Sequence, residues 1–204
     1  MDVLISSPSF VKRLIQRRRA NGVDRFDEVW DGVYVVSPLA NNEHQQVAGK
    51  IYIALDAAID LPGLGKVLPG ANVSDREDDW RKNYRCPNVV VFLPGNPAIN
   101  KESHWLGGPD FAVEIVSPRD RSRQKFDFYA KVGVRELLLV DRKPWALELY
   151  RLDNGVLTLA GRSDIARPDV LASRVIPLSF RLVPGEVRPT IEIAHADSLQ
   201  RWST

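Results

Sequence analysis

The stretch Phe111-Ala112-Val113-Glu114-Ile115-Val116 carries the strongest signal for the fold, because an apolar run of this length is typical of a strand buried on both faces. One acid, Glu114, interrupts the run. A carboxylate removed from water costs several kcal/mol unless it is paired, protonated or bound to a metal ion. Side chains alternate along a strand, so Glu114 shares one face of the sheet with Ala112 and Val116. The sequence therefore predicts a buried acid that has a partner.

The segments around this strand predict an α/β domain. Helices are expected over residues 9–20, 43–59 and 121–132. Asn42 is a suitable N-cap for the second helix, and Gly133 closes the third. An Asp31-Gly32 pair between two short extended runs is a strong hairpin signal. The expected strands are residues 26–30, 33–37, 66–68, 89–93, 111–116, 137–140 and 147–150. Strands and helices in this order indicate a mixed sheet.

The chain is expected to form one domain over residues 1–204, because no linker divides it. Residues 1–22 carry a basic helix, and residues 155–204 are expected to be a C-terminal extension of short extended pieces. The expected loops are residues 38–42, 74–83 and 94–109.

Composition excludes several classes of protein. The 204 residues are 44% hydrophobic and 26% charged, values of an ordinary globular protein. The formal net charge of +2 is too small to indicate nucleic-acid binding by itself. The one cysteine, Cys86, excludes an internal disulfide and a multi-cysteine zinc site. There is no apolar run of membrane-spanning length and no signal-peptide pattern, so a cytoplasmic protein without membrane contact is expected.

The helix expected after Glu114 places Lys125 among apolar residues. At 100° per residue, Lys125 falls in the middle of the apolar stripe. The residues within about 60° of it are Phe128, Tyr129 and Val132. Such a lysine either forms a structural ion pair or projects its ammonium toward a functional centre.

A buried acid followed by a lysine on the next helix is typical of centres that hydrolyse phosphodiesters. The carboxylate holds Mg²⁺, the ion activates water, and the lysine stabilises charge or orients the nucleophile. The alternative to a catalytic role is a structural one, in which the buried acid pairs with an arginine. A second ligand is expected at the start of the neighbouring strand, where the chain offers Asn88.

A larger pattern supports this interpretation. Its segments are Pro87-Asn88-Val89-Val90-Val91-Phe92, Phe111 to Pro118, Lys125-Phe126-Asp127-Phe128-Tyr129-Ala130-Lys131-Val132-Gly133-Val134-Arg135-Glu136, Val140-Asp141, Glu28-Val29-Trp30-Asp31-Gly32 and His44-Gln45. Together they resemble the Uma family of restriction endonucleases, part of the PD-(D/E)XK nuclease superfamily. The resemblance covers residues 25–150 or so.

The resemblance implies a restriction-endonuclease-like fold, in which helices flank a central mixed β-sheet, and cleavage of DNA with Mg²⁺ or Mn²⁺. Carried onto this sequence, it makes Glu114 a metal ligand beside the backbone carbonyl of Ile115. Lys125 becomes the catalytic lysine, displaced from its usual place two residues after the acid, where this chain has Val116. A homodimer is implied by analogy with cleavage of both DNA strands.

The chain departs from the family at Asn88, where the family has an aspartate. An amide oxygen can coordinate a metal ion, but it lacks the charge. At about 4 Å and an effective dielectric constant near 20, that charge is worth about 4 kcal/mol before solvation offsets it. The sequence therefore predicts a weakened endonuclease, or one with another metal ligand. The alternative is an inactive nuclease-fold module that binds nucleic acid or protein.

Other candidates carry less weight. Glu28 is either an acid at the rim of the site or a strand-edge charge, and His44 is either a core histidine or a residue that lines the site. Arg119, Arg121 and Arg123, like the basic first helix, could bind phosphates, although charge runs are usually solvated faces.

Overall fold

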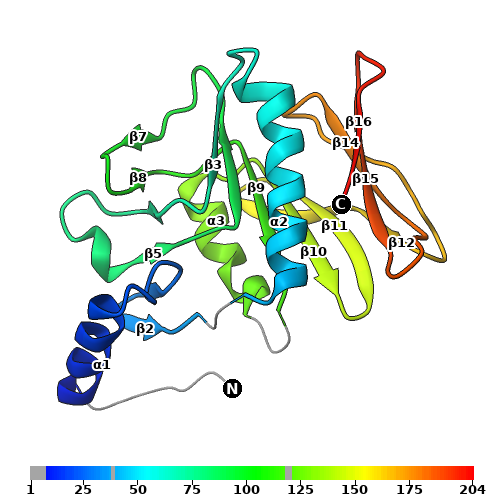
Figure 1. Cartoon of the computed structure of the whole chain (residues 1–204). Helices are drawn as coiled ribbons and strands as arrows, with labels where there is room; N and C mark the ends of the chain where they lie inside the picture. The colour runs from blue at the N-terminus through cyan, green and yellow to red at the C-terminus, as the bar shows by residue number, and fades with distance from the viewer. Residues whose placement is uncertain (1–7, 38–39, 118–120) are drawn as a thin grey trace.

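A six-stranded mixed sheet forms the centre of the computed structural model, which describes residues 8–37, 40–117 and 121–204 (Figure 1). The order of its strands is β12-β11-β10-β9-β6-β3. Their bounds are β3 (Lys66–Pro69), β6 (Val89–Phe92), β9 (Phe111–Ile115), β10 (Glu136–Arg142), β11 (Trp145–Asp153) and β12 (Val156–Asp164). The strands β9 and β10 are parallel, and all other neighbours in this sheet are antiparallel. The predicted mixed sheet is confirmed.

Helices cover both faces of the central sheet. The helix α2 (Asn42–Leu55), continued by the π-helical turn η1 (Asp56–Asp60), packs on one face. The helix α3 (Phe126–Val132) packs on the other, with Phe128 and Tyr129 buried against Ala112 of β9. Its C-cap is Gly133, in the left-handed region at φ 86° as predicted. The cap of α2 is Asn41 and not Asn42, since its side chain accepts a hydrogen bond from the His44 amide.

The C-terminal residues contribute more to the fold than an extension would. The strand β12 belongs to the central sheet, and the rest form an antiparallel sheet on the α2 side. Its strands are β13 (Leu171–Ala172), β14 (Leu178–Val183), β15 (Thr190–His195) and β16 (Arg201–Ser203). Phe180 of this sheet stacks on Phe111 of β9 with ring centroids 5.7 Å apart. The sheet pairs consecutive strands, and β14 alternates buried and partly buried residues, so the expectation of short extended pieces understated a local signal.

A second six-stranded sheet, ordered β2-β1-β5-β4-β8-β7, lies beside the first. Its strands are β1 (Glu28–Trp30), β2 (Val33–Val35), β4 (Val73–Ser74), β5 (Tyr84–Arg85), β7 (Ile99–Asn100) and β8 (Trp105–Leu106), with the 3₁₀ turn η2 (Trp80–Lys82) between β4 and β5. The predicted hairpin is confirmed, with Asp31 and Gly32 at φ 47° and 86°. Two segments were expected to be loops. Residues 74–83 contain Ser74 of β4 and the turn η2, and residues 94–109 contain β7 and β8.

The predicted first helix is α1 (Pro8–Ala20), which projects from the lower left of the molecule in Figure 1. The third predicted helix begins differently from expectation: residues Ser122–Lys125 form a 3₁₀ turn, η3, and α3 starts at Phe126. Predictions for Pro38, Pro118 and Arg119 lie outside the described residues. No helix in the described ranges is long and apolar enough to cross a membrane.

Candidate active site at the end of strand β9

Glu114 lies near the carboxyl end of β9, a strand whose residues are all buried. Its residue is 3% exposed, as the apolar run predicted. Phe111, Val113 and Ile115 face the core shared with α2, whereas Ala112 faces the core shared with α3. The predicted alternation is therefore confirmed, and Glu114 points to the α3 side of the sheet.

The partner of Glu114 is Lys125, the last residue of η3. Its Nζ lies 2.8 Å from Oε1 of Glu114 and 2.8 Å from Oε1 of Glu28 on β1. The hydroxyl of Tyr129, one turn further along, also donates to Oε1 of Glu114. Two carboxylates, one ammonium and one phenol thus meet in one buried cluster, which we call the Glu114 centre. The buried Lys125 that the apolar stripe predicted is confirmed, although a 3₁₀ turn and not an α-helix carries it.

The second acid of the centre is Glu28, which β1 brings from the other sheet. Its residue is 2% exposed, so it lies inside the centre and neither at a rim nor at an exposed strand edge. The amide of Cys86 donates to its Oε1 at 2.8 Å, and the indole of Trp30 donates to its Oε2 at 2.6 Å. Both oxygens of Glu28 are therefore engaged by donors that fix its orientation.

Asn88 lies beside the end of β9, as predicted, because β6 pairs with β9 in the antiparallel sense. Its backbone amide donates to the carbonyl of Val113 at 3.0 Å. Its side-chain Oδ1 accepts the amide of Ile115 at 2.7 Å. The ring of His44 approaches from α2, with Nε2 3.2 Å from the carbonyl oxygen of Ile115. Asn88 and His44 thus hold the backbone that directly follows Glu114.

Burial and charge set the protonation of the centre. Loss of hydration raises the pKa of Glu114 to about 7, although the charge of Lys125 counteracts part of this rise. For Lys125, burial favours the neutral amine, but the charges of Glu114 and Glu28 outweigh it and raise the pKa of the ammonium. Lys125 therefore keeps its proton at neutral pH, and Glu114 is the group that titrates there.

A second buried cation, Arg85, lies next to the centre. Its guanidinium is sandwiched between the rings of Trp30 and Phe128, at 4.7 and 4.3 Å from their centroids. It donates to the carbonyl of Val29 at 3.0 Å. Burial lowers the pKa of its guanidinium, and the charge of Glu28 counteracts part of this lowering. Arg85 and Lys125 together balance the two carboxylates, so the centre is neutral when both acids are ionised.

The donor atoms at the end of β9 fit a divalent cation with a single charged ligand. Both hydrogen bonds that Glu114 accepts from the described residues go to Oε1, and its Oε2 could coordinate a metal ion. The amide oxygen of Asn88, which accepts the Ile115 amide, and the carbonyl oxygen of Ile115, which lies 3.2 Å from the His44 ring, are hard oxygens at the same end of β9. Each has a second lone pair that could coordinate a cation. Within the described ranges, no cluster of three or more histidine, cysteine, aspartate or glutamate side chains could hold a metal ion.

The remaining predicted residues lie at the edge of this region. Arg123 forms ion pairs with Asp141 at 2.6 Å and with Glu148 at 2.7 Å, and these hydrogen bonds raise its pKa. Any phosphate would compete with both acids for its guanidinium. The phosphate-binding role of Arg121 stays a prediction.

Sequence reasoning gave no site role to Tyr129 or Arg85. Tyr129 had a usable signal, because it follows Lys125 by four residues on the same apolar stripe. Arg85 had none, since its place depends on the rings of Trp30 and Phe128, which lie far from it in the sequence.

The family model and the solved structure that match this chain both carry a nuclease description. A search of the curated proteins found no match. Among solved structures, the fold is similar to one described as a putative nuclease belonging to DUF820 from Anabaena variabilis, with a TM-score of 0.56 and 16% identity over 72% of this chain and 80% of that one. The Uma2 family model, described as "Putative restriction endonuclease", matches residues 17–183. This match includes β1, β9 and η3, which build the Glu114 centre, and the chain belongs to the Uma2 family.

Proposed function

We propose that the Glu114 centre hydrolyses DNA phosphodiester bonds with the help of Mg²⁺ or Mn²⁺, and that its metal affinity is low. The observation that carries the proposal is the ammonium of Lys125 held 2.8 Å from Glu114, beside the hard oxygens at the end of β9. Family membership supports a nuclease as the class of enzyme.

The residues have separate roles in this proposal. Glu114, through Oε2, would hold the cation together with the amide oxygen of Asn88 and the carbonyl of Ile115. A bound divalent cation supplies Lewis-acid polarisation of the phosphodiester and activation of water. Lys125 stays protonated, so it acts as a positive charge beside the phosphate and does not serve as a general base.

Glu28 acts as a positioning residue. It holds one side of the Lys125 ammonium at 2.8 Å and is itself fixed by Cys86 and Trp30. When Glu114 shares its charge with a cation, Glu28 keeps the lysine in place. Its two engaged oxygens make it a poor metal ligand, so it does not replace the charge that Asn88 lacks.

Low metal affinity follows from Asn88. A site with one carboxylate attracts a divalent cation less strongly than a site with two, and the missing charge is worth about 4 kcal/mol before solvation offsets it. Asn88→Asp is therefore expected to tighten Mg²⁺ and Mn²⁺ binding by at least tenfold, measured by titration calorimetry. Asn154→Asp, in the β11–β12 turn, makes the same chemical change away from the centre and serves as the control.

Activity is tested with supercoiled plasmid and with single-stranded DNA in Mg²⁺ and in Mn²⁺. Nicking by the wild type should disappear in Glu114→Ala and Lys125→Ala, and should increase in Asn88→Asp. Nicking that persists in both alanine variants comes from a contaminant and refutes the proposal. Equal metal affinity in the wild type and Asn88→Asp would show that the metal site is assigned wrongly.

One observation favours a second function, a nuclease-fold module that binds nucleic acid without cleaving it. Oδ1 of Asn88 is already held by the Ile115 amide at 2.7 Å, and Lys125 already pairs with both acids at 2.8 Å. DNA binding without cleavage by the wild type, with cleavage gained in Asn88→Asp, would establish this second function.

A further inference from the structure

The helix α1 is strongly basic on its exposed side. Its 13 residues contain five cations and no acid. Val11, Leu14, Ile15 and Arg18 are its partly buried residues. On the opposite side Lys12, Arg13 and Arg17 are exposed, and none of them forms an ion pair with the part of the chain that the structure describes.

The remaining two cations of α1 are already engaged. Arg19 lies 3.6 Å from Asp24. Arg18 binds Asp27 with both Nε and a terminal nitrogen, at 2.5 and 2.8 Å, and also donates to the carbonyl of Val23 at 2.6 Å. Asp27 is 2% exposed and further accepts the amide of Ser37 at 2.8 Å. A buried, bidentate ion pair therefore fixes α1 to the protein.

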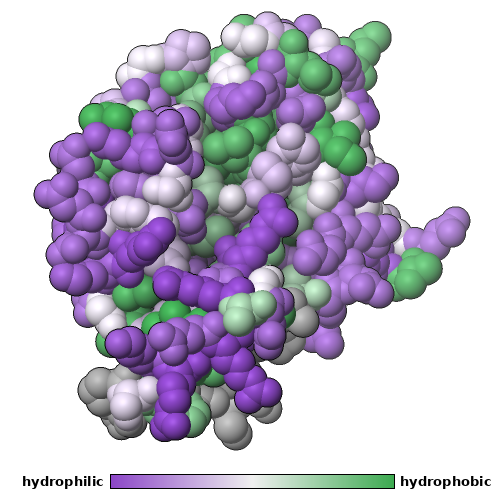
Figure 2. Space-filling model, turned by 60° about the vertical axis from the view of Figure 1, so that its left-hand side comes forward, coloured by the Kyte–Doolittle hydropathy of each residue, from purple (hydrophilic) through white to green (hydrophobic). Residues whose placement is uncertain are grey.

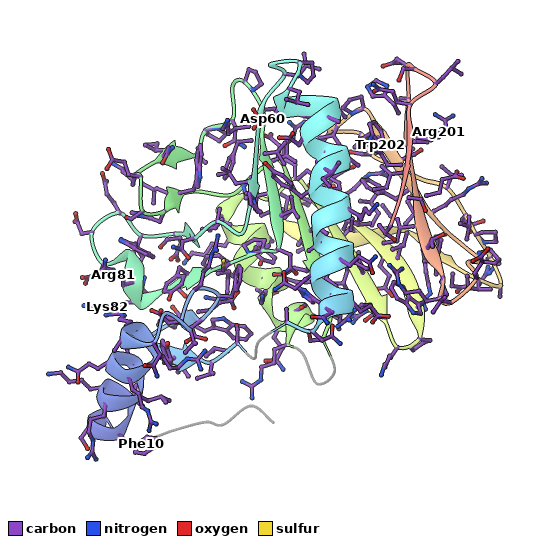
Figure 3. All side chains as sticks on the ribbon, in the orientation of Figure 1. Phe10, Asp60, Arg81, Lys82, Arg201 and Trp202 are labelled. Carbon is purple, nitrogen blue, oxygen red and sulfur yellow. The ribbon has the colours of Figure 1, made fainter. Side chains whose placement is uncertain are left out.

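This anchor connects α1 to the Glu114 centre. Asp27 directly precedes β1, so two consecutive residues, Asp27 and Glu28, hold Arg18 of α1 and Lys125 of the centre. In Figure 1, α1 lies toward the end of the molecule where β9 finishes, and Figure 3 labels Phe10 at its outer end. Figure 2 shows strongly hydrophilic atoms gathered in the lower part of the face, at the height of α1.

The exposed cations repel one another in the free protein. Arg13 and Arg17 are four residues apart on one helix face, a spacing at which like charges destabilise a helix. A helix that served only to cover the core would gain from an acid at one of these positions. A polyanion laid along this side would instead relieve the repulsion.

We propose that Lys12, Arg13 and Arg17 form a docking surface for the DNA backbone, which delivers the duplex to the Glu114 centre. The residues from Lys12 to Arg19 extend about 10 Å, over which a duplex presents about six phosphate charges. This inference rests on the proposed function for the identity of its partner, because a nuclease fold beside the surface favours DNA over an acidic protein or a lipid headgroup.

The test is equilibrium binding of a fluorescent 20-base-pair duplex, followed by anisotropy in EDTA on the Glu114→Ala background. Neither metal nor cleavage is then needed. The variant Arg13→Ala/Arg17→Ala should bind about 10- to 100-fold more weakly near 0.1 M salt, and the slope of log K against log salt should fall by about 2. Arg13→Lys/Arg17→Lys keeps the charges and should bind nearly as tightly as the parent.

The matched control is Lys50→Ala/Arg167→Ala, which removes two exposed cations outside α1. It should leave the affinity and the salt slope nearly unchanged. Thermal melts confirm that each variant is folded. An equal loss in the control and in the α1 variant would indicate general charge attraction and overturn the proposal. So would unchanged duplex binding combined with lost binding to phosphatidylserine vesicles, which would assign the surface to a membrane.

Failure of this inference is distinguishable from failure of the proposed function. If the protein nicks plasmid but binds DNA independently of α1, the proposed nuclease function stands and the proposed docking surface is refuted. If DNA binding depends on α1 but no cleavage occurs with Mg²⁺ or Mn²⁺, the docking surface stands and the proposed nuclease function is refuted.

Discussion

The pKa of Glu114 gives a prediction about stability as well as chemistry. Burial raises the pKa of this carboxyl from 4.5 to about 7 in the folded protein. Below pH 4.5 the acid is protonated in both the folded and the unfolded chain, so its full contribution to stability is present. Between pH 4.5 and 7 the unfolded chain ionises freely while the folded protein resists, and that contribution is lost. Stability attributable to Glu114 should therefore fall as the pH rises.

The size of this loss follows from the two pKa values. They differ by about two and a half pH units, and each unit corresponds to about 1.4 kcal/mol, so the loss is about 3 kcal/mol when complete. Other acids also titrate in this range. The variant Glu114→Gln isolates the effect, because the amide keeps the shape and can still accept hydrogen bonds from Lys125 and Tyr129.

Urea unfolding of the wild type and Glu114→Gln, from pH 4 to 8, measures the difference. The wild type should lose about 3 kcal/mol relative to the glutamine variant, with most of the loss between pH 5 and 7. A difference in unfolding free energy that stays constant over this range would mean that Glu114 titrates as it does in water. The account of the centre as a buried cluster in which loss of hydration raises the pKa of Glu114 would then be wrong.

Two further variants test the Glu114 centre, and a third tests the anchor of α1. Lys125→Met leaves two buried carboxylates without their ammonium and should destabilise the protein by about 3–5 kcal/mol at pH 8, with a smaller loss at pH 5, measured by urea unfolding. Tyr129→Phe removes a hydrogen bond that lowers the pKa of Glu114, so the stability transition described above should move to higher pH, and the variant should lose about 1–2 kcal/mol. Asp27→Asn weakens the anchor of Arg18 and should destabilise α1 by about 2 kcal/mol, seen as faster tryptic cleavage within α1.

Much of this centre was predictable because its signals are local. An apolar run predicts the strand that carries Glu114. A stripe of apolar residues at helical spacing predicts that Lys125 and Tyr129 are buried on the same side. The position of Asn88 was also predictable, since a strand that directly precedes β9 in the core has few other places to pair. These inferences need only the periodicity of a strand and of a helix.

The role of Glu28 could not be predicted in the same way. It lies 86 residues from Glu114 in the sequence and belongs to a strand of only three residues in another sheet. Its burial depends on the Trp30 indole, the Cys86 amide and the Lys125 ammonium. No periodicity reports such contacts. In the C-terminal part, by contrast, β14 and β15 do carry a local signal, because their buried residues stand at alternate positions, and the expectation of short extended pieces understated it.

The two acids of the centre therefore differ in what they can do, although one ammonium joins them. Glu28 has both oxygens fixed by donors, whereas Glu114 has one oxygen that takes no hydrogen bond from the described residues. Only Glu114 can take an additional partner at an oxygen that holds no donor from the described residues. Its pKa of about 7 means that a modest interaction decides whether it is ionised at neutral pH. A cation that binds Glu114 would favour its ionised form, while Glu28 still holds Lys125. Under the proposed function, the second acid therefore keeps the lysine in place, and metal affinity would depend on Asn88, the neighbour that carries no charge.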